Sequence, residues 1–189
     1  MPVGIKLIAL WQRLPVLMVI ALASNFLFSS VPARASLDED GMAFSARVCA
    51  LYDAPTTATF VGGGAGCTWR FGEGERGYTS TEIVMYVDRN AAPAAIEAVV
   101  QGYEVTLLEG FANMMGYRTE KFSPICGNWS SAGRMIFWGE PYSGNITGYA
   151  LCGDNLLMGE IHYPPGNGGE MEILYKKLMQ SMVPLLSAK

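Results

Sequence analysis

Residues 134–163, RMIFWGEPYSGNITGYALCGDNLLMGEIHY, contain three apolar segments separated by short turns rich in glycine, asparagine and proline. Turn-forming residues that separate β-branched and aromatic segments at hairpin spacing are typical of antiparallel strands. A fourth segment of this kind precedes them across a glycine-containing connection at 127–133. The pattern predicts a four-stranded antiparallel meander. The expected strands lie at 117–125, 134–138, 146–152 and 156–163.

Two amphipathic helices are expected on either side of this meander in the sequence. Pro93 suits the first turn of a helix, and apolar residues recur behind it at steps of three and four, which predicts a long central helix over 92–115. A second stripe predicts a C-terminal helix over 170–183, in which Glu172 can pair with Lys176 one turn later. The first stripe consists of Ile96, Val100, Tyr103, Leu107, Phe111 and Met114, and the second of Met171, Leu174, Tyr175, Leu178 and Met182.

The remaining segments complete an α+β fold. Residues 81–87 are β-branched and aromatic and predict a further strand. Residues 36–41 are polar and predict a disordered tip, and 42–71 predict short strands between glycine- and proline-containing breaks. Pro184 is expected to end the C-terminal helix. We therefore expect an antiparallel sheet whose apolar face is covered by the long central helix and the C-terminal helix.

The first residues have the order of a secretory signal peptide. Lys6 and Arg13 precede an apolar run of about 15 residues, and small residues at positions 33 and 35 meet the requirement of signal peptidase. The run is shorter than the roughly 20 residues that a permanent membrane span needs. We expect cleavage after Ala35, with cleavage after Ala33 and an uncleaved anchor as alternatives. Residues 36–189 would then form a single globular domain in the periplasm or outside the cell.

The charge of the expected mature domain limits its partners. Removal of residues 1–35 takes away three basic side chains and leaves 10 basic residues against 17 acidic ones, a net charge of −7. Such a chain repels phosphate backbones and anionic lipids, so we expect neither nucleic-acid binding nor stable membrane insertion after cleavage. The 154 remaining residues have the length of one domain.

All four cysteines, Cys49, Cys67, Cys126 and Cys152, lie in the expected mature domain. An even count in an oxidising compartment favours two disulfides, and free buried thiols are the alternative. The shortest spacing is 18 residues, so the close pairs typical of metal sites are missing and no metal is expected. Of the three possible connectivities we expect Cys49–Cys67 and Cys126–Cys152, because the meander places Cys126 and Cys152 at one end of the sheet.

Over residues 80–186 the chain consists of a strand, a long helix, a four-stranded meander and a closing helix, in that order. This order resembles the PsbP and Mog1-like α/β/α sandwich fold, and the stretch 149–158 followed by 172–182 is similar in layout to the last strand pair and closing helix of that family. The resemblance lies in topology and includes no diagnostic motif. It implies a sandwich-like fold and an accessory or binding role, since members of the family act mostly without catalysis. It assigns no functional residue.

Two further features are candidates for chemistry. The glycine-rich stretch 62–66 could cradle a phosphate, but no Lys-Ser/Thr pair follows it, so a flexible or tightly turning loop is the better interpretation. His162 is the only histidine and shares a strand face with Glu160. Because no nucleophile motif accompanies it, a solvent-facing pair is the favoured interpretation. We assign no catalytic residue and expect no cofactor.

Trp129, Trp138 and Tyr142 lie in or beside the turns of the meander. Exposed together, they would form an aromatic patch suited to binding a sugar or a protein, and packing in the core or at an edge is the alternative. The sequence favours an exported non-catalytic binding or accessory protein of the bacterial periplasm or cell envelope. A small secreted hydrolase that uses acidic residues is the alternative, because two carboxylates suffice for glycoside hydrolysis.

Overall fold

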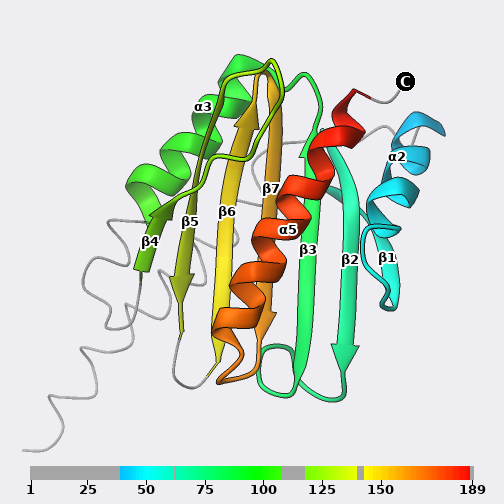
Figure 1. The fold of residues 1–189 in the computed structure, drawn as a ribbon, viewed down its shortest axis with the longest axis vertical. Helices are drawn as coiled ribbons and strands as arrows, with labels where there is room; N and C mark the ends of the chain where they lie inside the picture. Colours follow the sequence, from blue (N-terminus) through cyan, green and yellow to red (C-terminus); the bar gives the residue numbers. More distant parts are fainter. Residues whose placement is uncertain (1–38, 62, 108–117, 140–142, 188–189) are drawn as a thin grey trace, which may run out of the picture. The chain divides into compact units, whose positions relative to one another are not determined.

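A computed structural model describes residues 39–61, 63–107, 118–139 and 143–187, so the expected signal peptide lies outside the described residues. Residues Arg34–Lys189 form one compact unit. Within the described residues, none of the helices has the length and apolarity that a membrane crossing requires. The strands are β1 (Thr56–Val61), β2 (Gly64–Gly72), β3 (Ser80–Asp88), β4 (Arg118–Lys121), β5 (Ser131–Trp138), β6 (Gly144–Cys152) and β7 (Asn155–Tyr163) (Figure 1). The helical elements are α2 (Glu39–Cys49), α3 (Pro93–Gln101), the π-helical η1 (Gly102–Leu107) and α5 (Gly168–Leu186).

The described strands form one antiparallel sheet in the order β1-β2-β3-β7-β6-β5-β4. The sheet consists of two meanders, β1-β2-β3 and β4-β5-β6-β7, which meet where β3 pairs with β7. At this junction Glu82 lies opposite His162. The mixed α+β class and the four-stranded antiparallel meander are confirmed.

One face of the sheet carries the main hydrophobic core. Side chains alternate along each strand, so Ile83 of β3 and Ile161 of β7 point to the same face. Both are fully buried under α5, which lies across the sheet in Figure 1. Tyr175 of α5 is also fully buried and donates its hydroxyl to the carbonyl oxygen of Gly159 at 3.2 Å. The predicted stripe of the C-terminal helix therefore packs on the sheet.

The opposite face contacts α3 and η1. Tyr149 and Leu156 are buried there, and the half-buried Val100 packs against them. The hydroxyl of Tyr103 forms a hydrogen bond with that of Thr147 at 2.8 Å, and its ring lies 5.3 Å from the ring of Tyr149. The predicted central helix begins as the α-helix α3 and continues as the π-helix η1, whose last residue is Leu107. The end of the expected helix, residues 108–115, lies outside the described residues.

The N-terminal part of the domain differs from the prediction. Glu39–Cys49 forms the helix α2, where the sequence predicts a disordered tip followed by short strands. The buried positions of α2 follow helical spacing, but two of the four are glycine and serine, so the apolar period is concealed in the sequence. These positions are Gly41, Phe44, Ser45 and Val48.

The C-terminal helix is longer than predicted. It runs from Gly168 to Leu186 and continues through Pro184, which the sequence places at its end. Proline removes one backbone hydrogen bond, but Leu185 and Leu186 pack against the main core and stabilise the last turn. The expected pair between Glu172 and Lys176 forms at 2.7 Å.

The described part of the glycine-rich stretch, residues 63–66, is a tight turn at Gly63 followed by strand. Gly64 and Gly66 belong to β2, and Gly63 lies in the turn before it. A Cβ atom on Gly66 would collide with the backbone of Met85 and Tyr86 on β3. Glycine therefore allows the close approach of two strands at this point, and the interpretation as a flexible loop is wrong for Gly66.

Two disulfides form, and they are the pairs expected from the sequence. Cys49 bonds to Cys67 with their Cα atoms 5.1 Å apart and joins the end of α2 to β2. The fully buried Trp69 donates its indole N–H to the carbonyl oxygen of Cys49 at 3.2 Å and reinforces this junction. Cys126 bonds to Cys152 at the end of β6, with their Cα atoms 5.5 Å apart.

Candidate functional site

The connection between β4 and β5, residues 122–130, is held at several points. Cys126 forms its disulfide with the end of β6. The side chain of Gln180 on α5 accepts a hydrogen bond from the N–H of Ile125 at 2.8 Å and donates one to its carbonyl oxygen at 3.0 Å. The N–H of Trp129 bonds to the carbonyl oxygen of Cys126 at 3.3 Å and closes a turn. The backbone of this 122–130 loop is therefore fixed by a covalent bond to the end of β6, by hydrogen bonds to α5 and by a hydrogen bond within the loop.

Two large apolar side chains on the 122–130 loop face solvent. Ile125 is 79% exposed and Trp129 is 39% exposed. The ring of Trp129 packs on Gly153, where an added Cβ atom would lie 3.3 Å from it. Next to Trp129 is a hollow of about 340 Å³, and a fixed apolar surface beside a concave region is typical of recognition sites. The hollow is lined by Cys126, Gly127, Asn128, Trp129 and Ser187.

The structure does not bring Trp129 and Trp138 together. Trp129 precedes β5 and Trp138 is the last residue of that strand, so the length of β5 separates them by roughly 23 Å. Trp138 is half-buried and lies opposite Asn145 of β6. Tyr142 lies outside the described residues. A single patch of Trp129 and Trp138 is therefore excluded by the direction of the strand, and Trp129 is the exposed tryptophan of the two.

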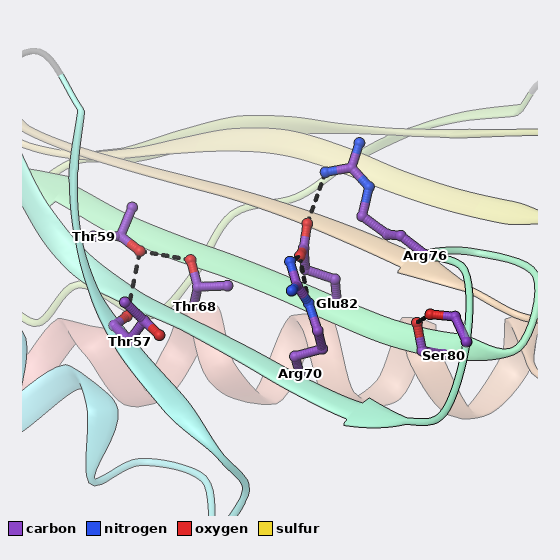
Figure 2. A network of polar contacts seen from close by, with 8 residues as sticks. Thr57, Thr59, Thr68, Arg70, Arg76, Ser80 and Glu82 are labelled. Atoms are coloured by element: carbon purple, nitrogen blue, oxygen red, sulfur yellow. Dashed lines mark hydrogen bonds and ion pairs between the residues drawn. The ribbon is translucent and has the colours of Figure 1, made fainter.

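A second group of polar residues lies on β2, β3 and the hairpin between them (Figure 2). Glu82 is only 4% exposed, and Arg70 and Arg76 donate to its two carboxylate oxygens, at 2.9 Å from Arg70 Nε and 2.7 Å from Arg76. Burial alone would raise the pKa of Glu82, but the bonds from the two arginines outweigh it and the pKa is lowered. Glu82 is therefore ionised at neutral pH with both oxygens occupied, and it holds the hairpin rather than transferring protons.

His162 lies beside this group, on the neighbouring strand. It is 9% exposed, and its Nε2 atom lies 2.7 Å from Oε1 of Glu160. The two side chains are close, as expected, but the geometry of their contact is not that of a hydrogen bond, and the expectation of a solvent-facing pair is wrong for His162. Gly77 of the β2–β3 hairpin covers it, because a Cβ atom on Gly77 would lie 3.8 Å from the Cβ atom of His162. In the described part of the chain, no group of three or more histidine, cysteine or acidic side chains is placed to hold a metal ion.

Sequence reasoning misses several residues of the 122–130 loop and of the group around Glu82. Ile125 is predicted as the end of a strand, but it lies in a loop whose backbone is held by Gln180, 55 residues away in the chain. Glu82 does carry a signal, since it is a single acidic residue within the apolar run 81–87. A charge within a strand-like run indicates a basic partner on an adjacent strand. Arg70 is that partner.

Comparison with known proteins adds no functional information. The chain matches no protein-family profile and no curated protein. Among solved structures it is similar to a Pseudomonas aeruginosa protein described as "Protein of Unknown Function PA94" and "Putative Regulator". The two share 13% sequence identity with a TM-score of 0.37 over 68% of this chain and 96% of the other. A likeness at this level carries no argument about what the chain does.

Proposed function

We propose that the chain is an exported, non-catalytic binding or accessory protein of the bacterial periplasm or cell envelope, and that the 122–130 loop is its recognition surface. The observation that carries the proposal is the exposure of Ile125 and Trp129 on a loop fixed by the Cys126 disulfide and by Gln180. Apolar side chains on a fixed loop lose little conformational entropy on binding, so more of the contact energy becomes affinity.

The location and class of the protein have separate support. Two disulfides favour an oxidising compartment, in agreement with the expected signal peptide at residues 1–35. The topological resemblance to PsbP and Mog1-like proteins, with their sandwich of helices around a sheet, favours an accessory role.

A small secreted hydrolase is a second candidate, favoured by one observation. Glu160 and His162 lie 2.7 Å apart on β7, so a carboxylate could orient the imidazole as a base. Glu82, which lies opposite His162 on β3, has both oxygens bound by arginine and is a poor proton donor. The pair therefore lacks the second acid that a two-carboxylate mechanism needs, and we favour binding.

In the test, the mature domain is immobilised and incubated with native envelope extract. The affinity of the domain for the protein that co-purifies with it is then measured. Trp129→Ala should weaken binding about 30-fold or more, since truncating a central tryptophan typically removes about 2 kcal/mol. The control is Ile173→Ala, because Ile173 is 70% exposed on α5 and lies outside the loop. Equal binding by the Trp129 variant would refute the proposed surface. Loss of function in a folded His162→Ala protein would favour the hydrolase.

A further inference from the structure

The strand β1 lies at one edge of the sheet and pairs only with β2 among the described strands. The N–H of Arg70 bonds to the carbonyl oxygen of Pro55 at 3.1 Å, which makes this opposed pair a hydrogen-bonded one. Opposed pairs of an antiparallel ladder alternate between bonded and non-bonded, so Thr57 and Thr59 direct their backbone groups toward β2. The residues that alternate with them direct their N–H and C=O groups away from the sheet. These outward residues are Thr56, Ala58 and Phe60.

The two edges of the sheet differ in chemistry. At the far edge β4 is short, and three of its four residues are charged. Two of them, Arg118 and Glu120, form ion pairs with α5. In contrast, β1 has six residues, contains no charge and no proline, and is exposed over its first three residues. Short charged edges oppose the addition of another strand, whereas a neutral edge of β-branched residues permits it.

We propose that β1 pairs antiparallel with β1 of a second copy of this chain, which joins the two sheets into one across a two-fold axis. The outward-directed residues must face one another in such a pair, and a register centred on Ala58 achieves this. Ala58 then lies opposite Ala58 of the second copy, and Thr56 lies opposite Phe60 in both directions. Every outward N–H and C=O group of these three residues gains a partner.

Charge and size favour a second copy over other occupants of this edge. The mature domain carries a net charge of −7, so most contacts between two copies bring negative surfaces together, whereas β1 is neutral. Opposed Cβ atoms in an antiparallel pair lie about 4.5–5.5 Å apart, and Ala58 is the smallest side chain of the strand at the axis. A single pair of short strands buries a small area, so the dimer is weak and depends on concentration.

Sedimentation velocity of the mature domain over a wide micromolar concentration range tests the proposal. Ala58→Lys places two like charges opposite each other at the axis, and Ala58→Pro removes the outward N–H of that residue. Both changes should raise the dissociation constant of the dimer by roughly tenfold or more. Ile173→Lys makes the same change of charge at an exposed site on α5 and should dimerise as the unmodified domain does.

Each outcome decides the proposal. Dimerisation of the unmodified domain and of Ile173→Lys, with loss in the Ala58 variants, supports it. A monomer at every concentration overturns it, and so does an Ala58→Lys protein that dimerises as tightly as the unmodified domain. Ala58 is exposed, so the lysine variant should fold even if the proline variant does not, and circular dichroism verifies this.

Discussion

Removal of the Cys126–Cys152 disulfide is expected to lower the free energy of unfolding by about 3.5 kcal/mol. The two cysteines are 26 residues apart, and the loop-closure entropy that the bond removes from the unfolded chain gives this value at 25 °C. The same relation gives about 3.2 kcal/mol for Cys49–Cys67, which are 18 residues apart. Domains of this size typically have 5–15 kcal/mol of stability, so each variant should remain folded enough to measure.

The assay is urea unfolding of the double variant Cys126→Ala/Cys152→Ala, followed by tryptophan fluorescence. Alanine is chosen because both sites are buried and alanine introduces no polar group there. The matched control is Cys49→Ala/Cys67→Ala. Both variants should lose similar stability, but only the first should also weaken binding through Trp129, since Cys126 anchors the 122–130 loop.

Two results would refute this reasoning. A loss of less than about 1 kcal/mol in the Cys126 variant would show that the bond does not constrain the unfolded chain as the entropy relation requires. Equal loss of binding in both double variants, at matched fractions of folded protein, would show that the Cys126 bond has no special role in ordering the 122–130 loop.

Three further predictions concern the hairpin, the sheet and the N-terminus. The pKa of Glu82 is lowered in the folded state, so its stabilising contribution is complete above the ordinary value of 4.5 and is lost as pH falls through the folded value. Glu82→Gln should therefore lower the free energy of unfolding at pH 7 by about 1–2 kcal/mol. This is less than for a fully buried ion pair, because both arginines are exposed. Urea titration should also show that the stability of the variant falls less steeply as the pH is lowered. Gly66→Ala should destabilise the domain by about 1–3 kcal/mol. The control Gly169→Ala should not destabilise it, because the added Cβ atom meets no neighbour, and equal melting temperatures of the two variants would contradict the prediction. Intact-mass measurement of the exported protein should give a chain that begins at Ser36, and a full-length cytoplasmic product would disprove the signal peptide.

Elements with a complete local pattern are predictable from the sequence. The stripe of α5 is visible because its buried positions are apolar, and the second meander is visible because turn residues separate its strands. The helix α2 is not, because Gly41 and Ser45 occupy half of its buried face. The pairing of β3 with β7 has no local signal either, since it joins residues about 80 positions apart such as Glu82 and His162.

The candidate site is only partly predictable, because exposure depends on distant residues. Trp129 lies beside a turn, as the sequence predicts, but its distance from Trp138 depends on the direction and length of β5. The burial of His162 depends on the β2–β3 hairpin and Gly77, which belong to the other meander. Such contacts follow from the sheet order, and that order is not encoded in any single stretch of sequence.

The two disulfides join cysteines that are consecutive along the chain, and each lies within one half of the sheet. Cys49–Cys67 belongs to α2 and the first meander, and Cys126–Cys152 to the second. Closure of a loop becomes less favourable as the loop lengthens. The two native pairs close shorter loops than a bond between Cys67 and Cys126 would, so the native pairs form more readily. Each bond can therefore form within its own half of the domain, before β3 and β7 meet. Oxidative folding of this chain then needs no reshuffling of bonds by a disulfide isomerase, and the final step is the non-covalent joining of two halves that are already crosslinked.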